Sequence, residues 1–182
     1  MRRFPVAVAI VVLMALGACG DKDDESSSDS SSSSGASTDE SKAFEPCTAV
    51  TDDEVAQIMG HAVTKKEDPG GGCTWGNEDD PRLASLSLSV TPADQGGGIE
   101  SSKVGTRSVL NGEAADTPGL GDAAYLVVGT GKEFAKEQVQ AQGVIESGGQ
   151  LVTVGITQLG GAAESEVQSQ AGAAMALVAS KF

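Results

Sequence analysis

Hydrophobic and polar residues alternate strictly over residues 84–91. One side of this segment carries Leu86, Leu88 and Val90, and the other side carries serines and a threonine. A period of two residues with one apolar and one polar side predicts a β-strand with one buried and one solvated face. Residues 123–128 predict another strand.

A β-hairpin is predicted near the C-terminal end of the chain. Residues 138–146 and 151–157 both have strand character and are separated by the short turn segment Ser147-Gly148-Gly149-Gln150. Two strand-like runs joined by a short glycine-containing segment are typical of an antiparallel pair. A further strand is predicted to begin at Thr74-Trp75.

A short helix is predicted directly after Val50. Thr51 and Glu54 have the spacing of a capping box, in which each residue's side chain accepts a hydrogen bond from the backbone of the other. Val50 can pack on Val55 across this helix start, and Gly60 is a typical C-terminal stop.

A longer helix is predicted over residues 162–180. Its acids Glu164 and Glu166 suit the first turn and Lys181 suits the last, because these charges complement the helix dipole. The helical period places four small or branched apolar residues on one buried side: Val167, Ala171, Ala174 and Val178.

These elements together predict an α+β fold, in which an antiparallel β-sheet is packed on one face by the N-terminal and the C-terminal helix. The glycine-rich stretches at residues 70–72 and 96–98 are predicted to be loops, where most of the mobility is expected.

The N-terminus has the pattern of an export signal. Arg2 and Arg3 precede an uncharged apolar run over residues 4–18, which is shorter than the about 20 residues of a membrane-spanning helix. Leu16-Gly17-Ala18-Cys19 resembles the lipobox of bacterial lipoproteins, and this resemblance implies removal of residues 1–18 and lipid attachment to Cys19. The alternative is an ordinary secreted protein with an unrelated cysteine near its cleavage site.

Residues 19–45 are predicted to be the lipidated cysteine and a disordered tether. Residues 26–34 contain eight serines and one aspartate, and acids flank this run. Such a segment buries too little apolar surface to offset its ordering entropy. Glycosylation of the serine tract, or its binding to a basic partner, is an open alternative. Residues 46–182 are predicted to form a single extracytoplasmic domain.

The net charge of the chain is −14. Removal of the signal leaves −16, of which the tether carries −6 and the domain −10. Because such a surface repels phosphates, a nucleic-acid partner is excluded. Aromatic residues make up 3% of the chain, which leaves little for stacking on sugars or bases.

The domain contains two cysteines, Cys47 and Cys73. A pair of cysteines in an exported domain predicts a disulfide, whose closure of the intervening loop contributes roughly 3.5 kcal/mol in the chain-entropy model. A redox-active or metal-binding pair is the alternative, but the chain lacks a C-x-x-C spacing and has one histidine. Trp75 is expected to pack against this disulfide and the sheet.

Several short motifs resemble a family of actinobacterial cell-envelope lipoproteins of unknown function. They are Pro46-Cys47, the helix end Met59-Gly60, Gly72-Cys73-Thr74-Trp75, and Gly119-Leu120-Gly121-Asp122-Ala123-Ala124-Tyr125. The resemblance spans most of residues 46–182. It implies a Cys47–Cys73 pair and a lipid-anchored extracytoplasmic location, and it implies no catalytic residue.

Other candidates for chemistry are weak. His61 follows Gly60 and is interpreted as a cation near a helix C-terminus. Glu78-Asp79-Asp80 lacks the spacing of a calcium loop, and Gly129-Thr130-Gly131-Lys132 lacks the leading glycine and the Ser or Thr of a phosphate loop. We therefore predict no catalytic residue, no cofactor and no metal site.

Two functions are consistent with the sequence. The first is a non-enzymatic, monomeric binding or protein-interaction module, held by its lipid anchor at the outer face of the cell membrane, with an envelope protein as partner. The alternative is a carrier of a hydrophobic small molecule or lipid, in an internal pocket lined by Leu86, Leu88, Val90, Val152 and Val154. A hydrolase, which would depend on His61, is a third and weaker hypothesis.

Overall fold

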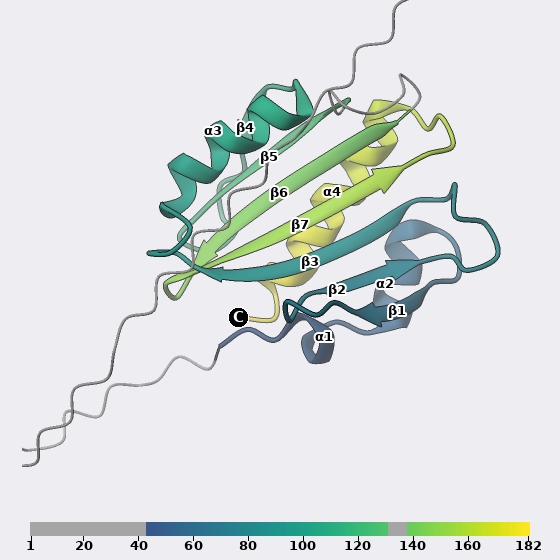
Figure 1. Ribbon diagram of the computed structural model, residues 1–182, viewed down its shortest axis with the longest axis horizontal. Coiled ribbons are helices and arrows are strands. Elements are labelled where there is room, and N and C mark those ends of the chain that lie inside the picture. The colour runs from purple at the N-terminus through teal and green to yellow at the C-terminus, as the bar shows by residue number, and fades with distance from the viewer. Residues whose placement is uncertain (1–42, 131–137) are drawn as a thin grey trace, which may run out of the picture. The chain divides into compact units, whose positions relative to one another are not determined.

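The protein is described by a computed structural model over residues 43–130 and 138–182 (Figure 1). Its strands are β1 (Thr64–Glu67), β2 (Cys73–Gly76), β3 (Ser85–Pro92), β4 (Ala114–Asp116), β5 (Ala123–Thr130), β6 (Val139–Ser147) and β7 (Gln150–Gln158). Its helices are α1 (Pro46–Ala49), α2 (Asp52–Met59), α3 (Gly98–Leu110) and α4 (Glu164–Ala179). The signal sequence, Cys19 and the tether predicted above lie outside the described residues.

The strands form one antiparallel sheet in the order β1-β2-β3-β7-β6-β5-β4. It consists of two runs of sequential strands, β1 to β3 and β4 to β7, which meet where β3 pairs with β7. That pairing runs from Ser85 opposite Thr157 to Pro92 opposite Gln150. The α+β class is therefore confirmed, as is the hairpin formed by β6 and β7.

The main core lies between the sheet and helices α2 and α4. α4 contacts β5, β6 and β7, and α2 contacts α4. The apolar side of β3 faces this core, and Leu86 and Leu88 are each 1% exposed. Trp75 is fully buried in the same cluster as Cys73, and its indole Nε1 donates a hydrogen bond to Asp52 Oδ1 at 2.9 Å.

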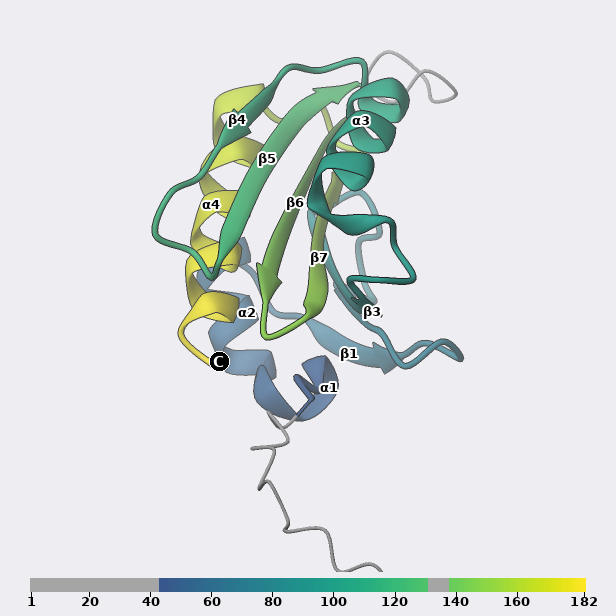
Figure 2. The ribbon, with the colours of Figure 1, turned by 90° about the vertical axis from the view of Figure 1, so that its left-hand side faces the viewer.

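The opposite face of the sheet is covered in part by α3, which contacts β5 and β6 (Figure 2). A second cluster fills this side, with Leu110, Tyr125, Val127, Val144 and Leu151 buried. The Tyr125 hydroxyl lies 2.8 Å from Ser102 Oγ and 3.0 Å from Thr106 Oγ1. The hydrophobic pattern does not predict α3, and Gly98, predicted to lie in a loop, is instead the first residue of this helix.

The two predicted helices are confirmed, but Lys181, which was predicted for the last turn of the second helix, follows the end of α4 at Ala179. Thr51 and Glu54 form the capping box at the start of α2, and Gly60 ends the helix in the left-handed conformation at φ 73°. The predicted side of α4 is the buried one, with each of its four residues at most 1% exposed: Val167, Ala171, Ala174 and Val178. Within the described residues, the structure contains no helix long and apolar enough to cross a membrane.

Candidate functional site

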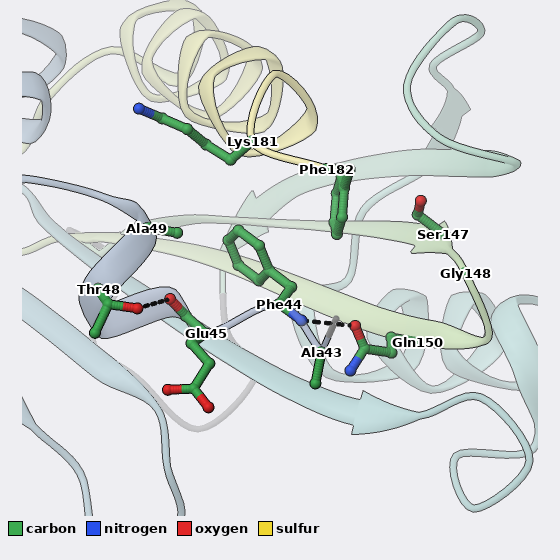
Figure 3. Close-up of a pocket in the computed structure, with 10 residues that line it drawn as sticks. All are labelled: Ala43, Phe44, Glu45, Thr48, Ala49, Ser147, Gly148, Gln150, Lys181 and Phe182. Atoms are coloured by element: carbon green, nitrogen blue, oxygen red, sulfur yellow. Dashed lines mark hydrogen bonds between the residues drawn. The ribbon is translucent and has the colours of Figure 1, made fainter. Parts of the chain in front are cut away.

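A surface cleft of about 820 Å³ lies where the described chain begins (Figure 3). Three segments that are distant in sequence form its walls: residues 43–49 with α1, the turn between β6 and β7, and the chain after α4. The side chains and backbone that line it are Ala43, Phe44, Glu45, Thr48, Ala49, Ser147, Gly148, Gln150, Lys181 and Phe182.

The apolar part of the cleft is a pair of phenylalanine rings. Phe44 and Phe182 are turned toward one another, with their ring centroids 5.0 Å apart and their planes inclined by 44° (Figure 3). Phe44 is 7% exposed and belongs to the main core, whereas Phe182 is 48% exposed. The ring of Phe182 therefore presents apolar surface to solvent beside a rigidly held neighbour.

Gln150 fixes the position of Phe44. The Phe44 backbone N–H donates to Gln150 Oε1 at 3.0 Å, and Gln150 is the first residue of β7. Because β7 is paired on both sides, this hydrogen bond ties the beginning of the described chain to the centre of the sheet.

Lys181 is neutralised by an ion pair. Its Nζ lies 2.6 Å from Glu54 Oε1, and Figure 3 shows the side chain directed away from the ring pair. The bond from Lys181, together with the hydrogen bonds from Thr51, lowers the pKa of the Glu54 carboxyl from 4.5 to about 2. The positive charge of Lys181 is therefore paired with Glu54 at the edge of the cleft.

Glu45 is the other charged side chain of the cleft lining, and it is exposed. Its backbone carbonyl accepts hydrogen bonds from the Ala49 N–H at 2.9 Å and from Thr48 Oγ1 at 3.2 Å. These bonds hold the first turn of α1, so the position of residue 45 is fixed by backbone contacts. The Glu45 carboxylate is directed away from the ring pair in Figure 3.

A disulfide between Cys47 and Cys73 holds α1 to β2, with the two Cα atoms 5.5 Å apart. It confirms the predicted pair. Lys65 on β1 donates from Nζ to the Cys47 carbonyl at 2.8 Å, which adds a second connection between α1 and the edge of the sheet. These bonds keep one wall of the cleft in place, because α1 carries Thr48 and Ala49.

The other candidate residues lie away from this cleft. His61 Nδ1 lies 3.0 Å from the Ala62 carbonyl oxygen, to which it can donate a hydrogen bond. Asp80 pairs with Arg82 at 2.9 Å, which lowers the pKa of Asp80 to about 2, and Glu78 lies 3.8 Å from Lys66. Across residues 43–130 and 138–182, the structure brings together no group of three or more potential metal ligands.

The phosphate-loop-like segment is a strand end in the structure. Gly129 and Thr130 belong to β5, and residues 131 and 132 lie outside the described residues. The residues proposed to line a carrier pocket lie elsewhere too. Leu86, Leu88, Val152 and Val154 are each at most 1% exposed in the main core, and Val90 packs against it.

Sequence reasoning missed the cleft. Phe44 stands alone among polar residues just before the predicted domain start at Pro46, and its isolation in that stretch was a usable signal. Phe182 and Gln150 carried no such signal, because their roles depend on contacts with residues more than 100 positions away in sequence.

The structure defines a disulfide-linked α+β domain with an open cleft beside its first described residues. The chain belongs to the family described as "Protein of unknown function (DUF3558)", which it matches over residues 14–143. Curated proteins gave no significant match to the chain. The matched region contains Cys19, Cys47 and Cys73, and it ends within β6.

Proposed function

We propose that the protein is an actinobacterial cell-envelope lipoprotein, anchored through Cys19 at the outer face of the membrane, which binds a partner protein without catalysing a reaction. The observation that carries the interaction role is the cleft, where a half-exposed phenylalanine lies beside a buried one. Aromatic side chains in concave, well-supported positions are typical anchors of protein interfaces.

The family match supports the proposed anchor. It begins at residue 14, inside the apolar run, so the matched residues include Leu16-Gly17-Ala18-Cys19. The disulfide Cys47–Cys73 also supports export, because such bonds persist mainly in oxidising compartments. Two acyl chains would hold the protein on the membrane stably.

The carrier hypothesis has less support. A carrier needs an internal cavity, but the side chains assigned to its lining belong to a close-packed cluster with α4. The cleft that the structure does form is open to solvent and has polar residues in each of its walls. These features favour contact with a macromolecule over enclosure of a lipid.

The interaction role is tested by site-specific photo-crosslinking in the native envelope. A benzophenone amino acid at position 182 replaces one aromatic ring by another, and the same group at Ser165, at the far end of α4, is the matched control. We expect position 182, and not position 165, to give a discrete crosslinked protein. Equal or absent crosslinking at the two positions would contradict the proposal.

The anchor is tested separately with Cys19→Ser. We expect the variant to leave the membrane fraction and to lose labelling by a clickable palmitate analogue, while the unmodified chain retains both. Native mass spectrometry of the exported protein tests the carrier alternative, because a bound lipid would appear as a stoichiometric added mass that is lost on denaturation.

A further inference from the structure

We propose that the cleft accepts a basic peptide segment of the partner, in which an aromatic or branched apolar side chain is flanked by lysine or arginine. This inference rests on the proposed interaction function and names the chemistry of the partner at that same site. It follows from the charges, the ring pair and the hydrogen-bonding groups of the cleft.

The charge of the cleft favours a cation. Lys181 is already paired with Glu54, and the exposed Glu45, whose carboxylate is directed away from the ring pair in Figure 3, is the other charged residue among those that line the cleft. The surrounding domain has the same sign, because the described residues contain 17 acids and 6 bases. Five of those bases lie in ion pairs, and Lys65 is bonded to the Cys47 carbonyl.

The ring pair favours an apolar or aromatic anchor next to that cation. The exposed ring of Phe182 offers an edge for stacking, and its face can attract an ammonium or guanidinium group. Burying a leucine or phenylalanine side chain against the two rings contributes about 1.5–3 kcal/mol before the costs of association are subtracted.

Polar groups of the cleft suit a peptide backbone. Gln150 uses its carbonyl oxygen on the Phe44 N–H, so its amide nitrogen can donate to a peptide carbonyl. Ser147 and Gly148, in the turn that leads to Gln150, contribute a hydroxyl group and backbone to the same wall. An anionic lipid headgroup is disfavoured as a ligand, because Glu45 and the acidic surface of the domain repel its charge.

The test uses the full exported chain in nanodiscs of zwitterionic phosphatidylcholine. The probe is a fluorescent peptide with alternating lysine and apolar residues around one phenylalanine, and its counterpart has glutamate in place of lysine. Fluorescence anisotropy reports the affinity. We expect the basic peptide to bind at least about tenfold more tightly than the acidic one, with an affinity that falls as salt is added.

Two charge-reversal variants distinguish peptide binding at the cleft from non-specific attraction to the acidic surface. Glu45→Lys is expected to weaken binding of the basic peptide about tenfold, because it reverses the lining charge. Glu166→Lys makes the same change at the far end of α4, about 20 Å away along that helix, and is expected to change the affinity less than twofold. Equal losses in both variants would indicate non-specific attraction and overturn the inference.

Phe182→Ala tests the apolar contact. We expect it also to weaken peptide binding about tenfold, and a thermal unfolding curve close to that of the unmodified protein excludes general unfolding. Binding of the acidic peptide or of anionic vesicles with equal strength would overturn the proposed chemistry. Crosslinking at position 182 that is unaffected by Glu45→Lys would leave the interaction function standing while rejecting a basic partner.

Discussion

Lys181 Nζ lies 2.6 Å from Glu54 Oε1, although the two residues are 127 positions apart in sequence. The second oxygen of the same carboxylate accepts hydrogen bonds from the Thr51 N–H and hydroxyl, both at 3.0 Å. One side chain therefore caps α2 and holds the chain that follows α4. The position of Phe182 depends on this carboxylate through its neighbour Lys181.

The Glu54 carboxyl is expected to make stability pH-dependent in the acid range. Its pKa is lowered from 4.5 to about 2 in the folded state, so its contribution is fully present above pH 4.5 and is lost as the pH falls toward 2. The pKa of Asp80 is lowered from 3.8 to about 2, so its contribution is lost as the pH falls from 3.8 toward 2. The measurement is the urea midpoint as a function of pH.

The variant Glu54→Gln measures how much of the pH dependence of stability comes from Glu54. Glutamine can still complete the capping box, but it cannot form the ion pair with Lys181. We expect a loss of about 1 kcal/mol at neutral pH and a flatter decline below pH 4.5. An unchanged pH profile in Glu54→Gln would show that the ion pair does not contribute.

The Cys47–Cys73 disulfide is expected to contribute roughly 3.5 kcal/mol to the free energy of unfolding, given its sequence separation of 26 residues. The double variant Cys47→Ser, Cys73→Ser should lose that amount in urea denaturation. Addition of reductant should destabilise the unmodified protein and leave the double variant unchanged. Equal sensitivity of the two proteins to reductant would contradict this assignment.

The buried hydroxyl of Tyr125 is expected to stabilise the packing of α3. Tyr125→Phe removes the contacts with Ser102 and Thr106 while keeping the ring, and we expect a loss of about 1–2 kcal/mol. Thr106 keeps its hydrogen bond from Gln142 Nε2 at 3.0 Å in this variant. Ser102→Ala, which removes one of the two contacts, should cost less. An unchanged free energy of unfolding in Tyr125→Phe would mean that water replaces the hydrogen bonds of the tyrosine hydroxyl at no cost in stability.

The Gly-Leu-Gly-Asp segment before β5 is expected to have a structural role that depends on Gly121. Gly119 and Gly121 both have positive φ, 85° and 64°, but a Cβ at Gly119 would meet open space. A Cβ at Gly121 would collide with the Glu146 carbonyl oxygen and lie 2.9 Å from Ile145 Cγ2. We expect Gly119→Ala to cost about 1 kcal/mol and Gly121→Ala about 3 kcal/mol. Thermal unfolding of the two variants checks the order, and equal losses would contradict the steric argument.

The elements that the sequence predicted correctly are those with strong local signals. The alternation in β3, the turn between β6 and β7, the capping box of α2 and the apolar side of α4 each depend on neighbouring residues. α3 has no comparable signal, because its buried side includes Thr106 and Ser102 beside Leu110, and glycines occur at 98 and 105. Its hydroxyl groups are satisfied by Tyr125, which is a tertiary contact that periodicity cannot show.

The cleft could not be predicted from the sequence because its walls come from three separate segments. The edge strands were also difficult, since β1 consists of Thr64, two lysines and Glu67 and is mostly exposed. Such a strand has little apolar pattern, and its place is determined by backbone pairing with β2. The disulfide could be predicted because the domain has two cysteines and is expected to be exported to an oxidising compartment. That prediction did not depend on the arrangement of the sheet.

The chain enters the described domain at Ala43, which itself lines the cleft. A partner seated there would touch the residues that connect the domain to everything preceding it in sequence. If the chain is held at Cys19, the number of residues between Cys19 and Ala43 sets the maximum distance between the cleft and the membrane. That number therefore also sets the effective concentration of the cleft for a membrane-bound partner. Shortening that stretch would then restrict which partners are within reach while leaving the intrinsic affinity of the cleft unchanged.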